Sequence, residues 1–198
     1  EHQRDLRRII GAAEHARDLV RRLEHSVHGS EQEVGEPVQP LPVIRAALEQ
    51  VCKRLLSGET PAGAIRVHDH LTAMPPVRST RSGLHDVFVS VLTHAVESMP
   101  DGGDLWLRNA NSSGQIRVQV GDTGRGMDED TCRRVFDPFF TTKATVDAGL
   151  GLSLARGMIT RWGGSIEVAS KPQAGSTFTV VLLPWRPETG FVPGDAGS

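Results

Sequence analysis

The sequence predicts an α+β protein, a two-layer α/β sandwich in which helices cover one face of a mixed, mostly antiparallel sheet, preceded by a long N-terminal helix. Three observations support this fold class. Residues 3–28 show a heptad pattern of apolar side chains, later segments have helical apolar periodicity, and strand-like segments come in pairs around turn sequences. A chain of 198 residues is long enough for one sizeable domain and an appendage.

The N-terminal segment, residues 1–30, is predicted to form one helix with an apolar seam. Two series of side chains, each spaced by seven, run along it in step: Leu6, Ala13, Val20 and Val27, and Ile9, Ala16 and Leu23. Such a pattern indicates packing against a partner helix, whereas the alternative is a helix that packs on its own domain. We therefore expect a homodimer through this helix. Because the sequence starts within the helical register, we also expect it to be part of a longer protein.

The remaining elements follow from apolar periodicity and turn chemistry. Residues 31–40 predict a linker, and residues 186–198 predict a mobile tail after a domain at residues 41–185. The predicted helices are residues 42–56, 80–99, 128–135 and 150–162. The predicted strands are residues 64–71, 105–108, 115–120, 166–169 and 177–183. The last four strands are expected to form two hairpins, around the turns NSSG and KPQAG.

Composition argues against several classes of protein. A net charge of −2 provides no attraction for nucleic acid or for an anionic membrane surface. No apolar run approaches the ~20 residues needed to span a bilayer, and residues 1–30 have a charged helical pattern rather than that of a signal peptide. Cys52 and Cys132 lie far apart without metal-ligand spacing, so we expect reduced structural thiols and a cytoplasmic location.

A glycine-rich loop, GDTGRGM, follows the strand predicted at residues 115–120. Glycines in this position indicate that something approaches the backbone closely. Asp122 lies inside the loop, and its carboxylate would repel phosphate but accept well from an exocyclic amine such as that of adenine. The loop therefore predicts a site for a nucleotide base rather than for phosphates. The alternative is an ordinary strand-to-helix turn.

A second glycine pair and an aromatic segment extend this pattern. Gly149 and Gly151 open the helix predicted at residues 150–162, whose N-terminal N–H groups and dipole suit a phosphate. The segment between the two glycine loops has an aromatic cluster followed by polar side chains: Phe136, Phe139, Phe140, Thr141, Thr142 and Lys143. This arrangement predicts a hinged lid with polar groups near a phosphate tail, and the alternative is that the aromatic side chains belong to the core.

In this order, the motifs resemble the ATP-binding catalytic domain of bacterial two-component sensor histidine kinases. The matching stretches are DTGRGM, FDPFFTTK, GLGL, WGGSIEV and GSTFTVVLLP, and the resemblance covers about residues 37–185. That domain belongs to the GHKL superfamily, which also includes gyrase, Hsp90 and MutL. Residues 12–23, AAEHARDLVRRL, are similar to the second helix of the family's dimerisation and phosphotransfer hairpin.

The resemblance implies a role for each matching residue. Asp122 would accept from the adenine amino group, the glycines would admit the base and bend around the phosphates, and Phe136 and Phe140 would anchor the lid. The ATP-binding residues implied are Asp122, Gly124, Gly126, Met127, Phe136, Phe140, Thr142, Lys143, Gly149, Leu150, Gly151, Leu152, His94 and Glu97. No residue is assigned as catalytic, because no histidine in residues 1–28 is followed by an acid as the family's phosphoacceptor is.

The chain departs from the family at the metal site. The family carries two asparagines four residues apart on the helix before the first glycine loop, and the second coordinates the magnesium ion that bridges the phosphates. Here these positions are Ser90 and His94. Magnesium prefers oxygen ligands, whereas an imidazole suits softer metals. We expect a damaged magnesium site, with Ser90 and His94 at the positions of its ligands.

The leading functional expectation is the ATP-binding catalytic region of a sensor histidine kinase, which transfers the γ-phosphoryl group of ATP to a histidine upstream of this chain, with ATP and Mg²⁺ as cofactors. Its partners would be a second copy and a response regulator receiver domain, in the cytoplasm or in the cytoplasmic part of a membrane-bound or hybrid sensor. The alternative is a degenerate kinase module that binds nucleotide or acts as a scaffold.

Two further possibilities are less favoured by the residues. A superfamily ATPase of the gyrase or Hsp90 type would need a glutamate at the position of Ser90 to activate water. His68 and His70 lie on one face of a predicted strand and could form a metal pair, but no third and fourth ligands are evident. We expect both histidines to be exposed strand residues.

Overall fold

The computed structural model describes residues 37–56, 64–112, 114–141 and 149–186. The helix predicted at residues 3–28 lies outside the described residues, as do Thr142, Lys143 and almost all of the predicted tail. The architecture below therefore concerns the predicted domain of residues 41–185 and a few residues on either side of it.

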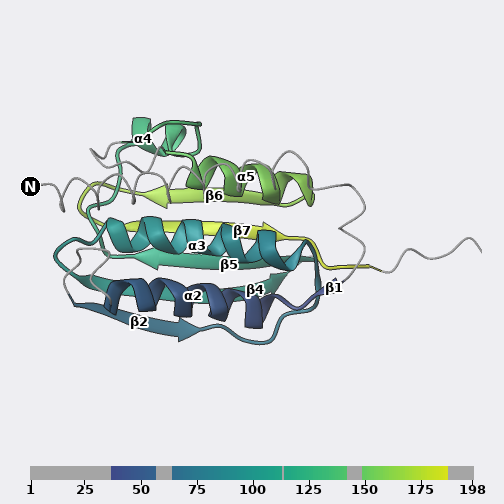
Figure 1. The fold of residues 1–198 in the computed structure, drawn as a ribbon. Coiled ribbons are helices and arrows are strands. Elements are labelled where there is room, and N and C mark those ends of the chain that lie inside the picture. The colour runs from purple at the N-terminus through teal and green to yellow at the C-terminus, as the bar shows by residue number, and fades with distance from the viewer. Residues whose placement is uncertain (1–36, 57–63, 113, 142–148, 187–198) are drawn as a thin grey trace, which may run out of the picture.

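The sheet has five strands in the spatial order β2-β4-β5-β7-β6 (Figure 1). Their bounds are Ile65–His70 for β2, Gly103–Ser112 for β4, Gln115–Asp122 for β5, Ser165–Ser170 for β6 and Ser176–Leu182 for β7. Strand β2 runs parallel to β4, and every other neighbouring pair is antiparallel. The prediction of a mixed, mostly antiparallel sheet is confirmed, and so are the two hairpins.

A separate two-stranded ladder was not predicted. It pairs β1, Pro37–Val38, with β3, Val77–Arg78. Strand β1 lies within the range that the sequence assigns to the linker, and a strand of two residues is too short to show an alternating pattern.

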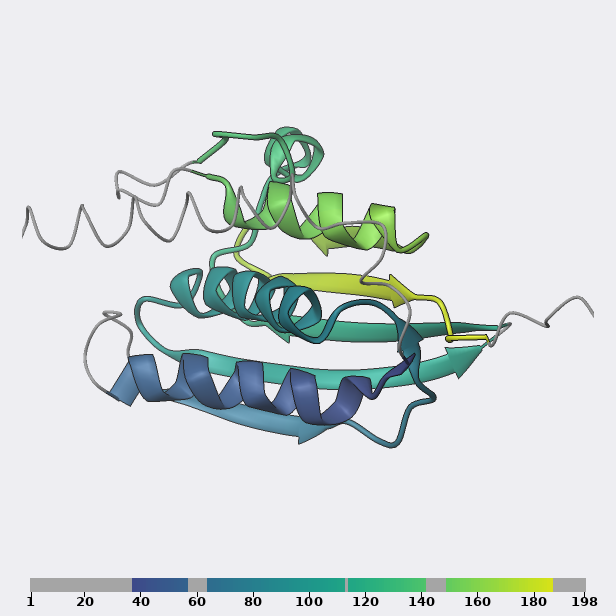
Figure 2. The same cartoon turned by 45° about the vertical axis from the view of Figure 1, so that its right-hand side comes forward.

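Three helices cover one face of this sheet: α2 at Pro40–Leu56, α3 at Arg81–Glu97 and α5 at Gly151–Arg161. Figures 1 and 2 show them as one layer in front of the strands, with α3 between the other two. The short helix α4, Glu129–Arg134, lies at one end of the sandwich (Figure 1). The predicted two-layer α/β sandwich is thus confirmed for the described residues.

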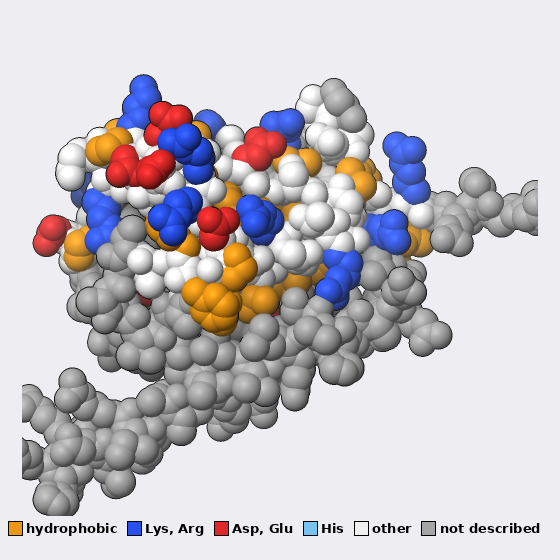
Figure 3. Space-filling model, turned by 90° about the horizontal axis from the view of Figure 1, so that it is seen from above, with side chains coloured by type: hydrophobic (Ala, Val, Ile, Leu, Met, Phe, Trp, Pro, Cys, Tyr) orange, Lys and Arg blue, Asp and Glu red, His pale blue; other side chains and the backbone are white. Residues whose placement is uncertain are grey.

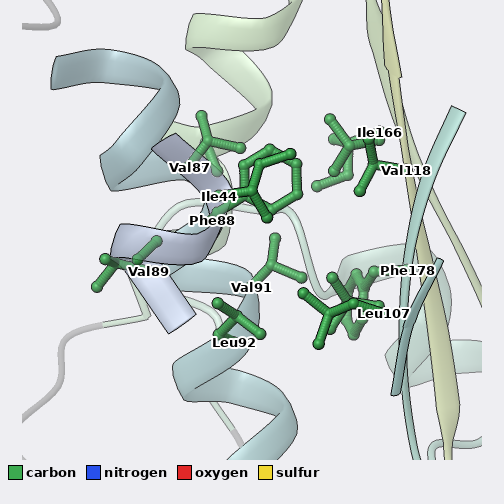
Figure 4. Close-up of a cluster of buried hydrophobic side chains, with 14 of the residues drawn as sticks. Ile44, Val87, Phe88, Val89, Val91, Leu92, Leu107, Val118, Ile166 and Phe178 are labelled. Carbon is green, nitrogen blue, oxygen red and sulfur yellow. The ribbon is translucent and has the colours of Figure 1, made fainter. Parts of the chain in front are cut away.

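The core lies between these two layers. Helix α3 begins where the side chain of Thr80 accepts from the N–H of Gly83 (3.1 Å), which caps its first turn. Its apolar face then meets alternate residues of the strands, and Figure 4 shows Phe88 directed toward Val118 and Val91 toward Phe178. These four side chains are fully buried. Tight packing of this kind fixes the position of α3 against β5 and β7, and so fixes what lies at their ends.

The outer face of the sheet carries polar groups instead. Asp104 of β4 binds Arg66 (Nη2 to Oδ2, 2.7 Å) and His68 (Nε2 to Oδ1, 2.8 Å) of β2. His68 and His70 are exposed and stack with ring centroids 6.3 Å apart. Within the described ranges, no group of three or more His, Cys, Asp or Glu side chains could hold a metal ion. The expectation of exposed strand histidines therefore agrees with their place in the fold.

Candidate functional site

The carboxylate of Asp122 is the centre of the candidate site. Asp122 is the last residue of β5 and is only 4% exposed. Its Oδ1 accepts from the hydroxyl of Ser98 (2.8 Å) and from the N–H of Gly124 (2.9 Å). Its Oδ2 is buried and has no hydrogen-bond partner. One oxygen is thus held in place by the protein, and the other is left as a strong acceptor for a ligand.

Burial also affects the charge of this group. Removal from water raises the pKa of Asp122, and hydrogen bonds from the Ser98 hydroxyl and from the backbone N–H groups of Gly124 and Ser176 oppose that shift. A buried acceptor without a donor costs ~1–3 kcal/mol, a cost that a bound donor would remove. The geometry and the energetics of Asp122 therefore both favour a ligand with an N–H group at this position.

The glycine loop after Asp122 packs against two other segments. A Cβ atom on Gly124 would lie 2.2 Å from the Ser98 hydroxyl, at the end of α3. Gly126 has a φ of +64°, and a Cβ there would lie 1.9 Å from the carbonyl oxygen of Lys171. Neither position has room for a side chain, and Gly126 also has a backbone conformation that other residues rarely adopt. Met127, which is 9% exposed, follows the loop and joins the core.

The aromatic segment is divided between core and surface. Phe136 is 6% exposed and meets Phe178 edge-on, with centroids 6.1 Å apart. Phe140 is half-buried, and the guanidinium of Arg134 lies 4.4 Å from its ring centroid. Phe139, in contrast, is 72% exposed and has a φ of +64°. The three phenylalanines that look alike in the sequence thus have three different environments.

The second glycine pair lies at the start of α5. Gly149 has a φ of +60°, and a Cβ on it would lie 2.4 Å from the carbonyl oxygen of Phe140. Leu150 and Leu152 are buried and anchor the start of the helix. Leu150 is the N-cap residue and makes no side-chain hydrogen bond to the first turn. The Leu150 side chain therefore does not cap the N–H groups at this helix start. An anion site requires N–H groups that are not capped by a side chain.

Helix α3 faces α5 with the residues predicted for the metal site. The Ser90 hydroxyl lies 3.5 Å from the position that a Cβ on Gly151 would occupy. His94, one turn later, is half-buried and meets Phe178 edge-on at 5.2 Å, and Glu97 is half-buried at the end of the helix. An imidazole packed on an aromatic ring does not fit an ion that prefers octahedral oxygen ligands, and the Ser90 hydroxyl offers only one such oxygen. The pair Ser90 and His94 thus fits magnesium poorly.

Sequence reasoning did not identify the hydroxyl groups of this site. Ser98 and Ser176 are two of the few buried polar side chains among the described residues, and Ser176 is paired with Asp122 in the β5–β7 register. The hydroxyl of Ser170 accepts a hydrogen bond from the N–H of Met127 (2.8 Å). The available signal was that Ser98 follows Glu97 near the end of a predicted helix, two strands before the glycine loop.

Charges are mixed on the surface above α4 and α5. Figure 3 shows this face from above, with Lys and Arg side chains interspersed with Asp and Glu side chains. No large area of one sign is seen there. Any attraction for phosphate therefore has to come from local groups, such as the start of α5, rather than from the field of this whole face.

The fold and the motifs together define an ATP-binding catalytic domain of the histidine kinase type, within the GHKL superfamily. Residues 79–187, more than half of the chain, match the family described as "Histidine kinase-, DNA gyrase B-, and HSP90-like ATPase". The chain belongs to this family. The recognition made from the motifs is thereby confirmed.

Three similar proteins give the extent of the likeness. The chain is 36% identical over 110 residues to the "Signal transduction histidine-protein kinase AtoS" of Escherichia coli strain K12, covering 55% of this chain and 18% of that protein. It is 29% identical over 194 residues to the "Sensor kinase CckA" of Brucella abortus, covering 90% of this chain and 20% of that protein. A structure titled "Mycobacterial sensor histidine kinase MprB" is 28% identical, with a TM-score of 0.65, over 76% of this chain and 97% of that one.

This chain spans about a fifth of the length of the curated relatives it matches. In the part of the chain that the structure describes, no helix is both long and apolar enough to cross a membrane.

Proposed function

We propose that this chain is the ATP-binding catalytic region of a sensor histidine kinase that acts in two-component signalling. The observation that carries the proposal is the buried Oδ2 of Asp122, which lacks a hydrogen-bond partner beside a glycine loop. The adenine amino group is a donor of the kind that this oxygen needs. Family membership and the likeness to sensor kinases support the same conclusion.

In this proposal, each part of the site binds one part of ATP. Asp122 accepts from the amino group, and the base lies against the loop of Gly124 and Gly126, whose backbone packs closely on Ser98 and Lys171. The start of α5, at Gly151, offers N–H groups and the positive end of the helix dipole to the phosphates. Thr142 and Lys143 are proposed to reach the phosphates as well, although both lie outside the described residues.

The proposed reaction is phosphoryl transfer to a histidine that lies outside this chain. A ring nitrogen of that histidine forms a bond to the γ-phosphorus while the bond from that phosphorus to the bridging oxygen of ADP breaks, and ADP leaves. Because such a reaction needs mainly positioning and charge stabilisation, the residues of this chain would act by holding ATP in line with the acceptor.

The direct test compares nucleotides that differ at the position that faces Asp122. We expect ATP to bind to this chain in a calorimetric titration, and GTP to bind much more weakly. Guanine has a carbonyl oxygen where adenine has its amino group, so an acceptor would face an acceptor. Absence of ATP binding, or equal affinity for GTP, would contradict the proposal.

A second candidate function is a degenerate kinase module that binds nucleotide or acts as a scaffold. The poor fit of Ser90 and His94 to magnesium favours it. In this case, ATP affinity of the parent chain should depend little on magnesium. The double variant Ser90→Asn, His94→Asn supplies amide oxygens, so its affinity should become magnesium-dependent. If the ATP affinity of the parent already depends on magnesium as strongly as that of the double variant, the chain is an active kinase domain rather than a degenerate one.

The proposed partners are a second copy of the chain, through the helix at residues 1–30, and a response regulator receiver domain, in a cytoplasmic setting. The heptad seam of that helix lies outside the described residues. Deletion of residues 1–30 should leave a folded monomer, whereas the intact chain should associate in a concentration-dependent way. If light scattering still gives the molar mass of a dimer after the deletion, the dimer interface lies elsewhere.

A further inference from the structure

The turn between β6 and β7, residues 171–175, is in contact with the glycine loop that follows Asp122. The N–H of Gln173 donates to the carbonyl oxygen of Arg125 (2.7 Å), in the middle of that loop. Gln173 itself has a φ of +61°, so the turn adopts an uncommon backbone conformation at the point of contact. These two segments lie about 45 residues apart in the sequence and form one side of the site together.

The two segments also touch backbone to backbone. A Cβ on Gly126 would lie 1.9 Å from the carbonyl oxygen of Lys171. A Cβ on Gly175 would lie 1.9 Å from the carbonyl oxygen of Asp122. Because a glycine on each side is pressed against the backbone of the other, the shape of the loop depends on the position of the turn.

The hydroxyl of Ser170 connects these parts. It accepts from the N–H of Met127 (2.8 Å), donates to the carbonyl oxygen of Gly175 (2.8 Å), and lies 3.0 Å from the hydroxyl of Ser176. One hydroxyl can donate once and accept twice, so its hydrogen-bonding capacity is fully used if Ser176 is the donor. A single side chain thus joins the end of the glycine loop, the turn, and the start of β7.

Ser176 brings this connection to the base-binding carboxylate. It is 3% exposed and pairs with Ser170 on one side and with Asp122 on the other, in the registers of β6–β7 and β5–β7. Asp122 is in turn held by the hydroxyl of Ser98. Three hydroxyls and one carboxylate therefore extend across the sheet, from the end of α3 to the last residue of β6.

We propose that Ser170 is a positioning residue for nucleotide binding. We assign it no contact with the nucleotide itself, but its hydroxyl holds the N–H of Met127 at the edge of the site, and with it the backbone of Gly126 against which the base would lie. Loss of this hydroxyl frees the end of the loop and lowers the affinity for the adenine part of the ligand. This inference rests on the proposed function, since it concerns the same site.

The test is a set of three variants of this chain. Ser170→Ala removes the hydroxyl, Ser170→Thr retains it, and Ser165→Ala makes the same change at the exposed start of the same strand. Loss of one hydrogen bond of this kind predicts that Ser170→Ala binds ATP roughly two- to tenfold more weakly. The affinity for adenosine should fall by the same factor, because the change affects the part of the site that binds the base. Ser170→Thr and Ser165→Ala should bind as the parent does.

A measurement without nucleotide separates this inference from the proposed function. Hydrogen exchange at the amide of Met127 should be faster in Ser170→Ala than in the parent, while exchange in the core of α3 changes little. Unchanged exchange at Met127, or unchanged affinity for ATP and adenosine, would overturn the positioning role. A Ser170→Thr variant as weak as Ser170→Ala would overturn it too. A parent chain that binds no ATP overturns the proposed function, and with it any role in nucleotide binding.

Discussion

Replacement of Asp122 by Asn changes the chemistry of the site while keeping its shape. The amide oxygen can take the place of Oδ1, which accepts from Ser98 and Gly124 at 2.8 and 2.9 Å. The amide nitrogen then occupies the position of Oδ2. Where the parent presents an acceptor to the adenine amino group, the variant presents a donor. The loss should therefore fall on the ligand and not on the contacts within the protein.

The size of the effect follows from the charge of the lost acceptor. A hydrogen bond to a charged group contributes ~1.5–3 kcal/mol, which corresponds to roughly 10- to 150-fold in the dissociation constant. Stability should respond in the opposite direction. Burial raises the pKa of Asp122, so the ionised carboxylate destabilises the fold at any pH above that pKa, and the neutral amide avoids this cost. At neutral pH the variant should be at least as stable as the parent.

The assay combines calorimetric titration of ATP with denaturant unfolding, for the parent, Asp122→Asn and the control Glu49→Gln. Glu49 is an exposed acid on α2, so the control makes the same change of one charge away from the site. The stability advantage of Asp122→Asn should shrink as the pH falls through the raised pKa, because the parent carboxylate then becomes neutral in the folded state. Equal affinity of Asp122→Asn and the parent for ATP would refute the assignment of this carboxylate to the base.

Three further predictions concern the fold around the site. Gly126→Ala should lower the free energy of unfolding by about 1–3 kcal/mol, because of its positive φ and the adjacent carbonyl of Lys171. Gly157→Ala on α5, with open space around it, should raise it by about 1 kcal/mol. Equal effects of the two substitutions in denaturant unfolding would refute the reasoning. Phe139→Gly should stabilise by up to about 1 kcal/mol in the same assay, because a mostly exposed side chain in a left-handed conformation contributes little packing; a clear loss would reveal contacts of its ring. Asp104→Asn should lower the stability of the fold slightly and in a salt-sensitive way, because Arg66 and His68 on β2 lower the pKa of Asp104. Unfolding measured against pH should show this difference in stability at neutral pH. It should vanish in acid below the usual pKa range of an aspartate, where the parent carboxylate is also neutral.

Local patterns in the sequence were enough to predict the elements of the described fold. Helical periodicity located α2, α3 and α5 within a few residues, and the hairpin turns located β4 with β5 and β6 with β7. The strand that ends in Asp122 beside three glycines predicted the centre of the candidate site. The glycines that allow a close backbone approach and the aspartate that can accept a hydrogen bond all lie within a few residues of the sequence. The order of the predicted helices and strands along the chain indicated the fold class.

Features that depend on long-range contacts could not be predicted in this way. Serine is common on protein surfaces, so the sequence alone did not mark Ser98, Ser170 and Ser176. Only the end of α3 and the strand registers place these three residues in one row with Asp122. The exposure of Phe139 depends on a single backbone dihedral in an irregular segment. The two-residue ladder of β1 and β3 is held by pairing between segments about 40 residues apart, with too few residues for any periodicity.

The order of the strands also has a consequence for solubility. Of the described strands in the main sheet, β2 and β6 each have only one neighbour, and such a row of unpaired backbone groups can recruit a strand from another molecule. Strand β2 carries Arg66, Asp69 and His70 as exposed side chains, and β6 carries Glu167. Joining a second molecule along either strand would require these polar and charged side chains to be accommodated in a new continuous sheet. These side chains protect both edge strands against aggregation, and a mutation to an apolar residue at Arg66 or Glu167 would weaken that protection without touching the core.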